Sequence, residues 1–178
     1  RSEIPPAHTW RLEDLYPSDE AWERAKEELA GRLDEIVKFQ GQLDDAETLL
    51  ACLELDSDLS KAFGRLYSYA SMKSDQDTRV SKYLAMRQSV EQIMTEYGSK
   101  SAYIEPEILK LDRATIEQFI DAQPGLKVYR MYLMDILRRK AHKLSAEEEK
   151  ILAQAALLAE GPGSIYSVFS NAEMPYPE

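Results

Sequence analysis

Residues Leu126–Glu160 read LKVYRMYLMDILRRKAHKLSAEEEKILAQAALLAE, and this stretch decides the expected fold. Its first half has apolar side chains at helical spacing. The basic run 138–140 then occupies the last turn, where the partial negative charge of the helix C-terminus stabilises cations. Ser145 and Glu148 form a capping box that starts a second helix, which Gly161 ends. Because the connection is short, we predict an antiparallel helix hairpin whose apolar faces need partners from the rest of the chain.

The rest of the chain supplies further amphipathic helices. Ser18, Asp45 and Asp112 are each predicted to cap one, and a helix from Thr78 to about Tyr103 is expected to be the longest. The pair Ser57–Asp58 leaves open whether the second stretch is two helices or one. The predicted stripes are Trp22, Ala25, Leu29, Leu33, Ile36 and Val37 in the first helix and Val80, Leu84, Val90, Ile93, Met94, Tyr97 and Ile104 in the longest. We therefore predict an all-α, multi-helix antiparallel bundle.

Composition limits the classes of function. The 178 residues fit one domain or one lobe of a larger protein, and 22 basic against 32 acidic residues give a net charge of −10. Such a charge disfavours nucleic acid, because phosphate backbones are repelled, and it disfavours anionic membrane surfaces. No apolar run is long enough to span a bilayer, and no signal peptide is visible. The single cysteine, Cys52, is predicted to be a buried inert thiol in a reducing, cytoplasmic compartment.

The chain divides into three expected regions: an arm at 1–17, a long-helix hairpin at 18–104, and a helical region at 105–178 that forms one compact lobe with the preceding part. In the arm, the apolar residues expected to dock on the domain are Trp10, Leu12, Leu15 and Tyr16. Gly64 is expected to allow close helix packing or else to mark a weak point in its helix, and the small-residue patch 98–102 is expected to allow close contact with a neighbour. The chain starts without methionine and stops in an extended-looking stretch, so we expect it to be part of a longer polypeptide.

The sequence contains no recognisable catalytic motif. Zinc peptidases of the His-Glu-x-x-His type need two histidines one helical turn apart, but the two histidines here, His8 and His142, are followed by Thr9 and Lys143. His8 is expected on an exposed loop and His142 at a helix end. We therefore assign no catalytic, cofactor-binding or metal residue, and a zinc site from His8, His142 and a carboxylate is the disfavoured alternative.

Three ordered segments carry a family resemblance. They are Trp-x-Leu-x-Asp-Leu-Tyr at 10–16, Tyr-Ala-x-x-Lys-x-Asp-x-Asp-Thr at 69–78, and Arg-x-Lys-x-His-x-Leu-Ser-x-x-Glu-Glu-x-x-Leu-Ala at 138–153. Together they resemble the N-terminal helical region of the oligoendopeptidase F family. The resemblance implies a zinc-dependent endopeptidase that cuts short peptides, with a helical N-terminal lobe facing a C-terminal catalytic lobe across a deep channel. The zinc-binding part of that family has no counterpart in these residues.

The resemblance therefore implies that the chain is the non-catalytic N-terminal lobe of such a peptidase and walls its substrate channel. Zinc would belong to the full-length parent, and the implied partners are the C-terminal catalytic lobe and short peptides, with neither nucleic acid nor membrane. The alternative is a stand-alone helical protein-interaction module. The sequence beyond Glu178 would distinguish the two, because the peptidase hypothesis requires His-Glu-x-x-His there.

Overall fold

The structure is a computed structural model that describes residues 5, 8, 10–76, 80–140, 162–163 and 166. The chain forms two compact units, residues 1–138 and 139–178, and nearly all described residues belong to the first. Every regular element in the described part is a helix, so the all-α prediction is confirmed. The second half of the expected hairpin, residues 145–160, lies outside the described residues, as does His142.

The first helical segment changes type along its length. After a short 3-10 turn, η2 (Leu12–Asp14), helix α1 spans Asp19–Arg32 and continues as a 3-10 helix, η3 (Leu33–Phe39). The Oγ of Ser18 accepts the backbone N–H of Ala21 at 3.2 Å, which confirms the predicted cap. The segment ends at Gly41, whose φ of +80° suits glycine and whose N–H donates to Glu107 Oε1 at 2.6 Å.

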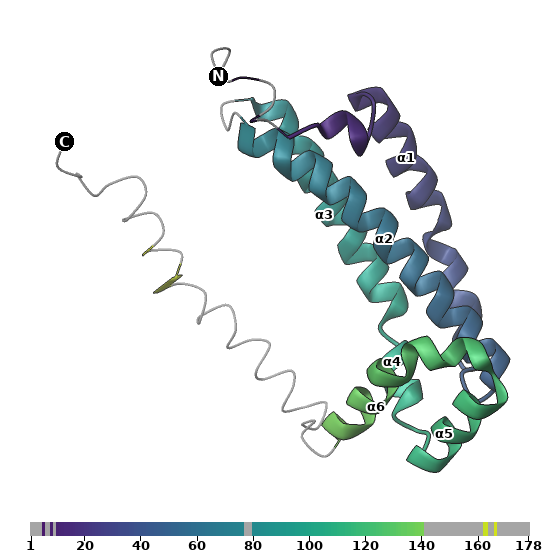
Figure 1. The fold of residues 1–178 in the computed structure, drawn as a ribbon. Coiled ribbons are helices and arrows are strands. Elements are labelled where there is room, and N and C mark those ends of the chain that lie inside the picture. The colour runs from purple at the N-terminus through teal and green to yellow at the C-terminus, as the bar shows by residue number, and fades with distance from the viewer. Residues whose placement is uncertain are drawn as a thin grey trace. The chain divides into compact units, whose positions relative to one another are not determined.

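Two long antiparallel helices, α2 (Ala46–Gln76) and α3 (Ser81–Ser101), form the backbone of the first unit (Figure 1). The expectation that the 78–103 helix would be the longest is wrong, since α2 runs unbroken for 31 residues. Ser57 and Asp58 do not interrupt α2, because their side chains contact partners in other elements. The Ser57 hydroxyl lies 3.2 Å from Tyr129 Oη, and Asp58 lies 3.6 Å from Arg32 Nη2.

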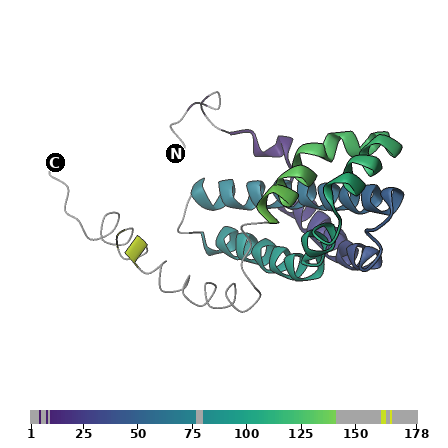
Figure 2. The ribbon, with the colours of Figure 1, turned by 90° about the horizontal axis from the view of Figure 1, so that it is seen from below.

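Three shorter helices gather where α2 begins and α3 ends (Figure 1). They are α4 (Ile104–Ile108), α5 (Arg113–Ala122) and α6 (Arg130–Arg139), and the 3-10 helix η4 (Pro124–Tyr129) leads into the last. Viewed along another axis, α5, η4 and α6 lie across the α2 side of the long pair (Figure 2). Asp112 accepts the Thr115 N–H at 2.8 Å and Asp45 accepts the Thr48 N–H at 2.9 Å, so both predicted caps are confirmed.

One buried apolar cluster extends from Leu12 to Ile136. Most predicted core residues belong to it, but four from the predicted stripes are exposed: Val37, Val80, Leu84 and Met94. On α3 the buried face carries Met86, Val90 and Tyr97. At about 100° per residue, Met94 lies roughly 60° from the centre of that face and Leu84 roughly 140° from it, and Val80 precedes the helix. Val37 falls in η3, where the 3-10 geometry changes the helical spacing and turns the side chain outward.

The small-residue expectations also need correction. A Cβ added at Gly64 or Gly98 would meet nothing within 4 Å, so neither glycine serves close packing within the described part of the chain. The tight position is Gly125, where a Cβ would lie 2.6 Å from Leu50 Cδ2. Glycine at this position therefore lets η4 approach α2 closely.

The N-terminal arm docks only in part. Leu12 is buried, and Leu15 and Tyr16 pack against the core cluster. Trp10 is 76% exposed, so its predicted docking is wrong for the described residues. The docked segment is held in place by η2 and by the Arg65 guanidinium, which donates to the Leu15 carbonyl at 2.9 Å.

Candidate functional site

The most connected polar group in the described part of the chain surrounds Asp19, at the start of α1. Its carboxylate accepts hydrogen bonds from Tyr69 Oη at 2.8 Å and Lys82 Nζ at 2.5 Å, and Lys73 Nζ lies 4.0 Å away. Tyr69 and Lys73 come from the last turns of α2, and Lys82 from the first turn of α3. One carboxylate therefore joins the start of α1 to the end of the α2–α3 pair. We call this group the Asp19 cluster.

Aromatic rings enclose the cluster. The rings of Tyr16 and Tyr69 meet edge to face with centroids 5.6 Å apart. The Lys73 ammonium lies 5.3 Å from the Tyr69 ring and 5.5 Å from the Tyr83 ring, within the range of a cation–π contact. The arm is held to the same place by Arg65, which lies 5.4 Å from the Tyr16 ring.

The groups of the Asp19 cluster shift one another's pKa values. Burial acts to raise the pKa of Asp19, but hydrogen bonds from Lys82 and Tyr69 outweigh it and hold the pKa of this carboxyl below its ordinary value. The hydrogen bond to Asp19 also raises the pKa of Lys82. Burial, and then the bond to Asp19, raise the pKa of the Tyr69 phenol. These directions keep Asp19 ionised, Lys82 protonated and Tyr69 neutral near neutral pH, which favours a structural clamp over proton transfer.

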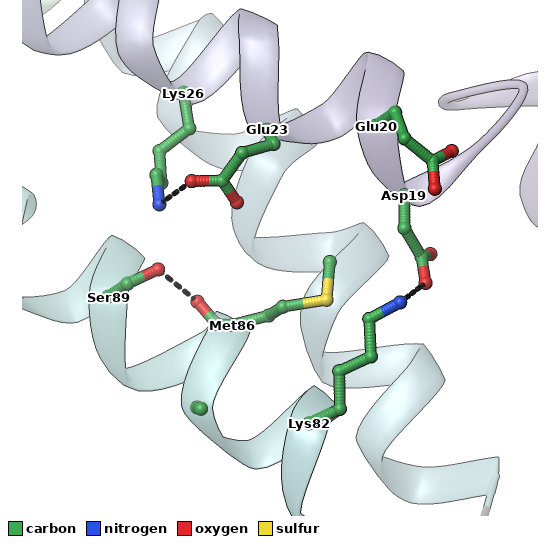
Figure 3. Close-up of a pocket in the computed structure, with 8 residues that line it drawn as sticks. Asp19, Glu20, Glu23, Lys26, Lys82, Met86 and Ser89 are labelled. Carbon is green, nitrogen blue, oxygen red and sulfur yellow. Dashed lines mark hydrogen bonds and ion pairs between the residues drawn. The ribbon is translucent and has the colours of Figure 1, made fainter.

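An open hollow of about 460 Å³ lies beside the cluster, between α1 and α3 (Figure 3). Lys82 reaches from α3 toward Asp19, and the Met86 side chain lies between the two helices (Figure 3). On the α1 side Lys26 pairs with Glu23. The lining residues are Asp19, Glu20, Glu23, Lys26, Lys82, Ala85, Met86 and Ser89. They offer neither a paired nucleophile and base nor a set of metal ligands.

A zinc ion would need several His, Cys, Asp or Glu side chains close together as ligands. Within the described ranges, no three His, Cys, Asp or Glu side chains come together as metal ligands. His8 lies exposed in the arm, as expected, and His142 is outside the described residues. The described side chains therefore do not fit a zinc ion. Likewise, no helix in the part of the chain that the structure describes could cross a membrane.

Comparison with known proteins connects these helices to peptidases. A family model described as Oligopeptidase F matches residues 107–176. The chain is 36% identical over 178 residues to the oligopeptidase PepF of Bacillus subtilis, covering 99% of this chain and 27% of that protein. It is also 36% identical over 181 residues to the plasmid oligoendopeptidase F of Lactococcus lactis subsp. cremoris, covering 99% of this chain and 30% of that protein. Over nearly its whole length, the chain is therefore similar to the N-terminal part of oligoendopeptidase F proteins.

Two solved structures have a similar helical fold over this part of their chains. A crystal structure of oligoendopeptidase-F from Enterococcus faecium superimposes with a TM-score of 0.71 at 31% identity, covering 89% of this chain and 31% of that one. A putative peptidase from Chlamydophila abortus gives a TM-score of 0.70 at 29% identity, covering 99% of this chain and 30% of that one. The chain thus spans about 30% of the length of its structural relatives.

Two segments that resemble oligoendopeptidase F in sequence meet in the Asp19 cluster. Tyr16 ends the first, and Tyr69 and Lys73 belong to the second. The third segment lies almost wholly outside the described residues. Sequence reasoning missed Asp19 and Lys82 as cluster members, because Asp19 reads as an ordinary first-turn acid that complements the helix dipole. The sequence feature that could have indicated Lys82 as a cluster member was its position soon after the Tyr69–Thr78 segment.

The single cysteine is buried, as predicted. Burial raises the pKa of the Cys52 thiol to about 11, and its sulfur lies 3.7 Å from Tyr103 Oη. The Tyr103 hydroxyl donates to the Ile36 carbonyl at 2.5 Å, so this contact links α2, η3 and the end of α3. A thiol that stays protonated at neutral pH is a poor nucleophile, and Cys52 is a packing residue.

Proposed function

We propose that residues 1–178 form the N-terminal helical lobe of a zinc-dependent endopeptidase of the oligoendopeptidase F type, which hydrolyses short peptides. The observation that carries this proposal is similarity along 99% of the chain to relatives named as oligopeptidases or oligoendopeptidases. The lobe itself is proposed to be non-catalytic. Its described residues lack a metal-ligand cluster, and its sequence lacks His-Glu-x-x-His.

The first test uses the gene and the purified protein. We expect the reading frame beyond Glu178 to encode His-Glu-x-x-His, and the full-length protein to cleave peptides only when zinc is bound. The chain 1–178 alone should bind no stoichiometric zinc and cleave no peptide. A reading frame without that motif would contradict the peptidase proposal, and tight zinc at one ion per 178-residue chain would contradict the non-catalytic lobe.

We further propose that the lobe forms one wall of the substrate channel, admitting extended peptides and excluding folded proteins. Rigidity supports this role. The Tyr97 hydroxyl on α3 donates to Asp56 Oδ1 on α2 at 2.5 Å, and the Phe63 and Tyr97 ring centroids lie 5.4 Å apart. Together with the Asp19 cluster, these contacts fix the long helix pair at both ends, so that it would move as a body.

The wall is tested by removing the whole first unit, residues 1–138, from the full-length protein, because the buried cluster extends from Leu12 to Ile136. We expect the truncated enzyme to retain zinc-dependent cleavage and to lose its limit on substrate size. The substrates are a free peptide and the same sequence placed in a loop of a folded protein. An unchanged preference for the free peptide would contradict the wall. Aggregation with loss of all cleavage would instead favour a lobe that only covers the catalytic half.

A further inference from the structure

The segment that continues α1 has an uncommon helical type. η3 is a 3-10 helix of seven residues, Leu33–Phe39, whereas 3-10 runs longer than about four residues are rare because their hydrogen bonds have poorer geometry. It follows α1 directly, so the two form one helical segment that changes type near its middle. A 3-10 stretch inside a longer helix often marks a hinge, which makes η3 a candidate for a moving part.

Two apolar patterns overlap in η3. With three residues per turn, a 3-10 helix aligns Leu33, Ile36 and Phe39 on one face. Leu33 and Ile36 are buried and Phe39 packs partly buried against the core, whereas Val37 is 40% exposed. In an α-helix, at about 100° per residue, Val37 would lie about 40° from Leu33 and Phe39 about 120° from it. An α-helical form would therefore turn Val37 inward and Phe39 outward.

We propose that residues 33–39 are a two-state helical switch, which exchanges the 3-10 form with an α-helical form in which Val37 takes the place of Phe39 in the core. The apolar stripe of α1 supports the second state, because Val37 continues that stripe from Leu29 and Leu33 at α-helical spacing. One sequence thus has an apolar face for each of the two helical types. The inference does not rest on the proposed peptidase activity.

The Tyr103 side chain holds the segment in the 3-10 form. Its hydroxyl donates to the Ile36 carbonyl at 2.5 Å. This carbonyl is the acceptor to which the N–H of Gln40 would donate in an α-helix. In the 3-10 form the Gln40 N–H donates to the Val37 carbonyl instead, at 3.1 Å. Loss of the Tyr103 hydrogen bond would therefore free the acceptor that the α-helical form needs.

The other contacts that hold this segment come from the same place, the junction of α3 and α4. Lys100 near the end of α3 pairs with Asp34, and Glu107 of α4 accepts the Gly41 N–H at 2.6 Å. Conversion of seven residues from a rise of about 2.0 Å to about 1.5 Å each would shorten the segment by about 3.5 Å. Because Trp22 fixes α1 on α2, the shortening would act at Gly41 and through it on α4. The switch therefore couples the helical form of η3 to the position of the α3–α4 junction.

The test is methyl NMR spectroscopy of the full-length protein with labelled valine methyl groups and a soluble gadolinium chelate. The relaxation enhancement that the chelate causes measures the exposure of the Val37 methyl groups. Tyr103→Phe removes the donor to the Ile36 carbonyl, and Phe39→Ala removes the side chain that packs in the 3-10 form alone. We expect each substitution to lower the Val37 enhancement at least about twofold, because the population shifts to the α-helical form.

The matched control is Tyr69→Phe, which removes a tyrosine hydrogen bond to Asp19 at the other end of α1 and should leave the Val37 enhancement unchanged. An unchanged value in Tyr103→Phe or in Phe39→Ala would overturn the inference, since η3 would then be a fixed 3-10 helix. A higher value would also overturn it, because the segment would then open to solvent. So would a rise at the buried Val90, which would mean that the whole core loosens.

Discussion

The indole N–H of Trp22 donates to the backbone carbonyl of Leu66 across 2.9 Å, and the Trp22 side chain is fully buried. This bond fixes α1 against the middle of α2, where both helices contribute to the core. Loss of a partner in a buried hydrogen bond leaves a polar group without its bond and adds a packing defect.

Trp22→Phe should therefore reduce the free energy of unfolding by about 1–3 kcal/mol, because it removes the donor and part of the ring volume. The measurement is urea unfolding followed by circular dichroism. Trp10→Phe is the matched control, since the same substitution at an exposed position should change stability by less than about 0.5 kcal/mol. Equal effects of the two substitutions would contradict the buried position of Trp22.

The two apolar faces of α6 predict opposite outcomes for alanine substitutions. Leu133→Ala should cost about 2–5 kcal/mol, because Leu133 is fully buried and a cavity would remain. Met131→Ala on the outer face should leave the stability of residues 1–178 within about 0.5 kcal/mol of the parent chain. Thermal or urea melts of both variants provide the measurement. A large loss from Met131→Ala would show that the outer face already packs within this chain.

Gly125 and Leu50 should be energetically coupled. Gly125→Ala places a methyl group where the Leu50 side chain lies, and the flexible end of that side chain must move. In a Leu50→Ala background the same substitution should be tolerated better, with an interaction energy of about 0.5–3 kcal/mol in a double-mutant cycle. Additive effects would mean that η4 and α2 are not in close contact at this point.

The Asp19 cluster predicts an acid-dependent loss of stability. The pKa of Asp19 is lower in the folded state than in the unfolded chain, so its contribution is present above the unfolded value of 3.8. That contribution is lost as the pH falls through the folded pKa. The free energy of unfolding, measured at pH 5 and then at successively lower pH, should decrease less steeply for Asp19→Asn than for the parent chain. Glu27→Gln, an exposed acid on the same helix, is the control and should keep the parent slope.

Cys52 should react with a thiol reagent only when the chain unfolds. Its pKa of about 11 and its burial leave almost no accessible thiolate at pH 8. In native buffer, colour development with a disulfide reagent should be slow and should follow the unfolding rate. Urea should make the same thiol react at once. Rapid reaction in native buffer would contradict the packing role.

Local signals made much of the fold predictable. The caps Ser18, Asp45 and Asp112 depend on short-range hydrogen bonds within three residues, and all three form as the sequence indicates. The continuity of α2 was not predictable, because Ser57 and Asp58 disfavour a helix interior until distant partners occupy them. Those partners, Tyr129 and Arg32, come from other elements.

The Asp19 cluster was harder to predict for the same reason. Tyr69 and Lys82 lie more than 50 positions after Tyr16 in the chain, and nothing in a single helix brings them to Asp19. The outer face of α6 was not separable from its core face in the sequence, since Met131 and Tyr132 are as apolar as their buried neighbours. Only the packing of η4 on α2 decides which side of the helix is covered.

The chain has two tryptophans in opposite surroundings, and this gives it a built-in spectroscopic reporter. Trp22 is fully buried, whereas Trp10 is 76% exposed. Native emission is therefore the sum of a blue-shifted indole that soluble quenchers cannot reach and a red-shifted one that they can. In a Trp10→Phe chain, all the remaining emission would come from a single indole at the junction of α1 and α2. Its wavelength would then follow the separation of these two helices without any added dye.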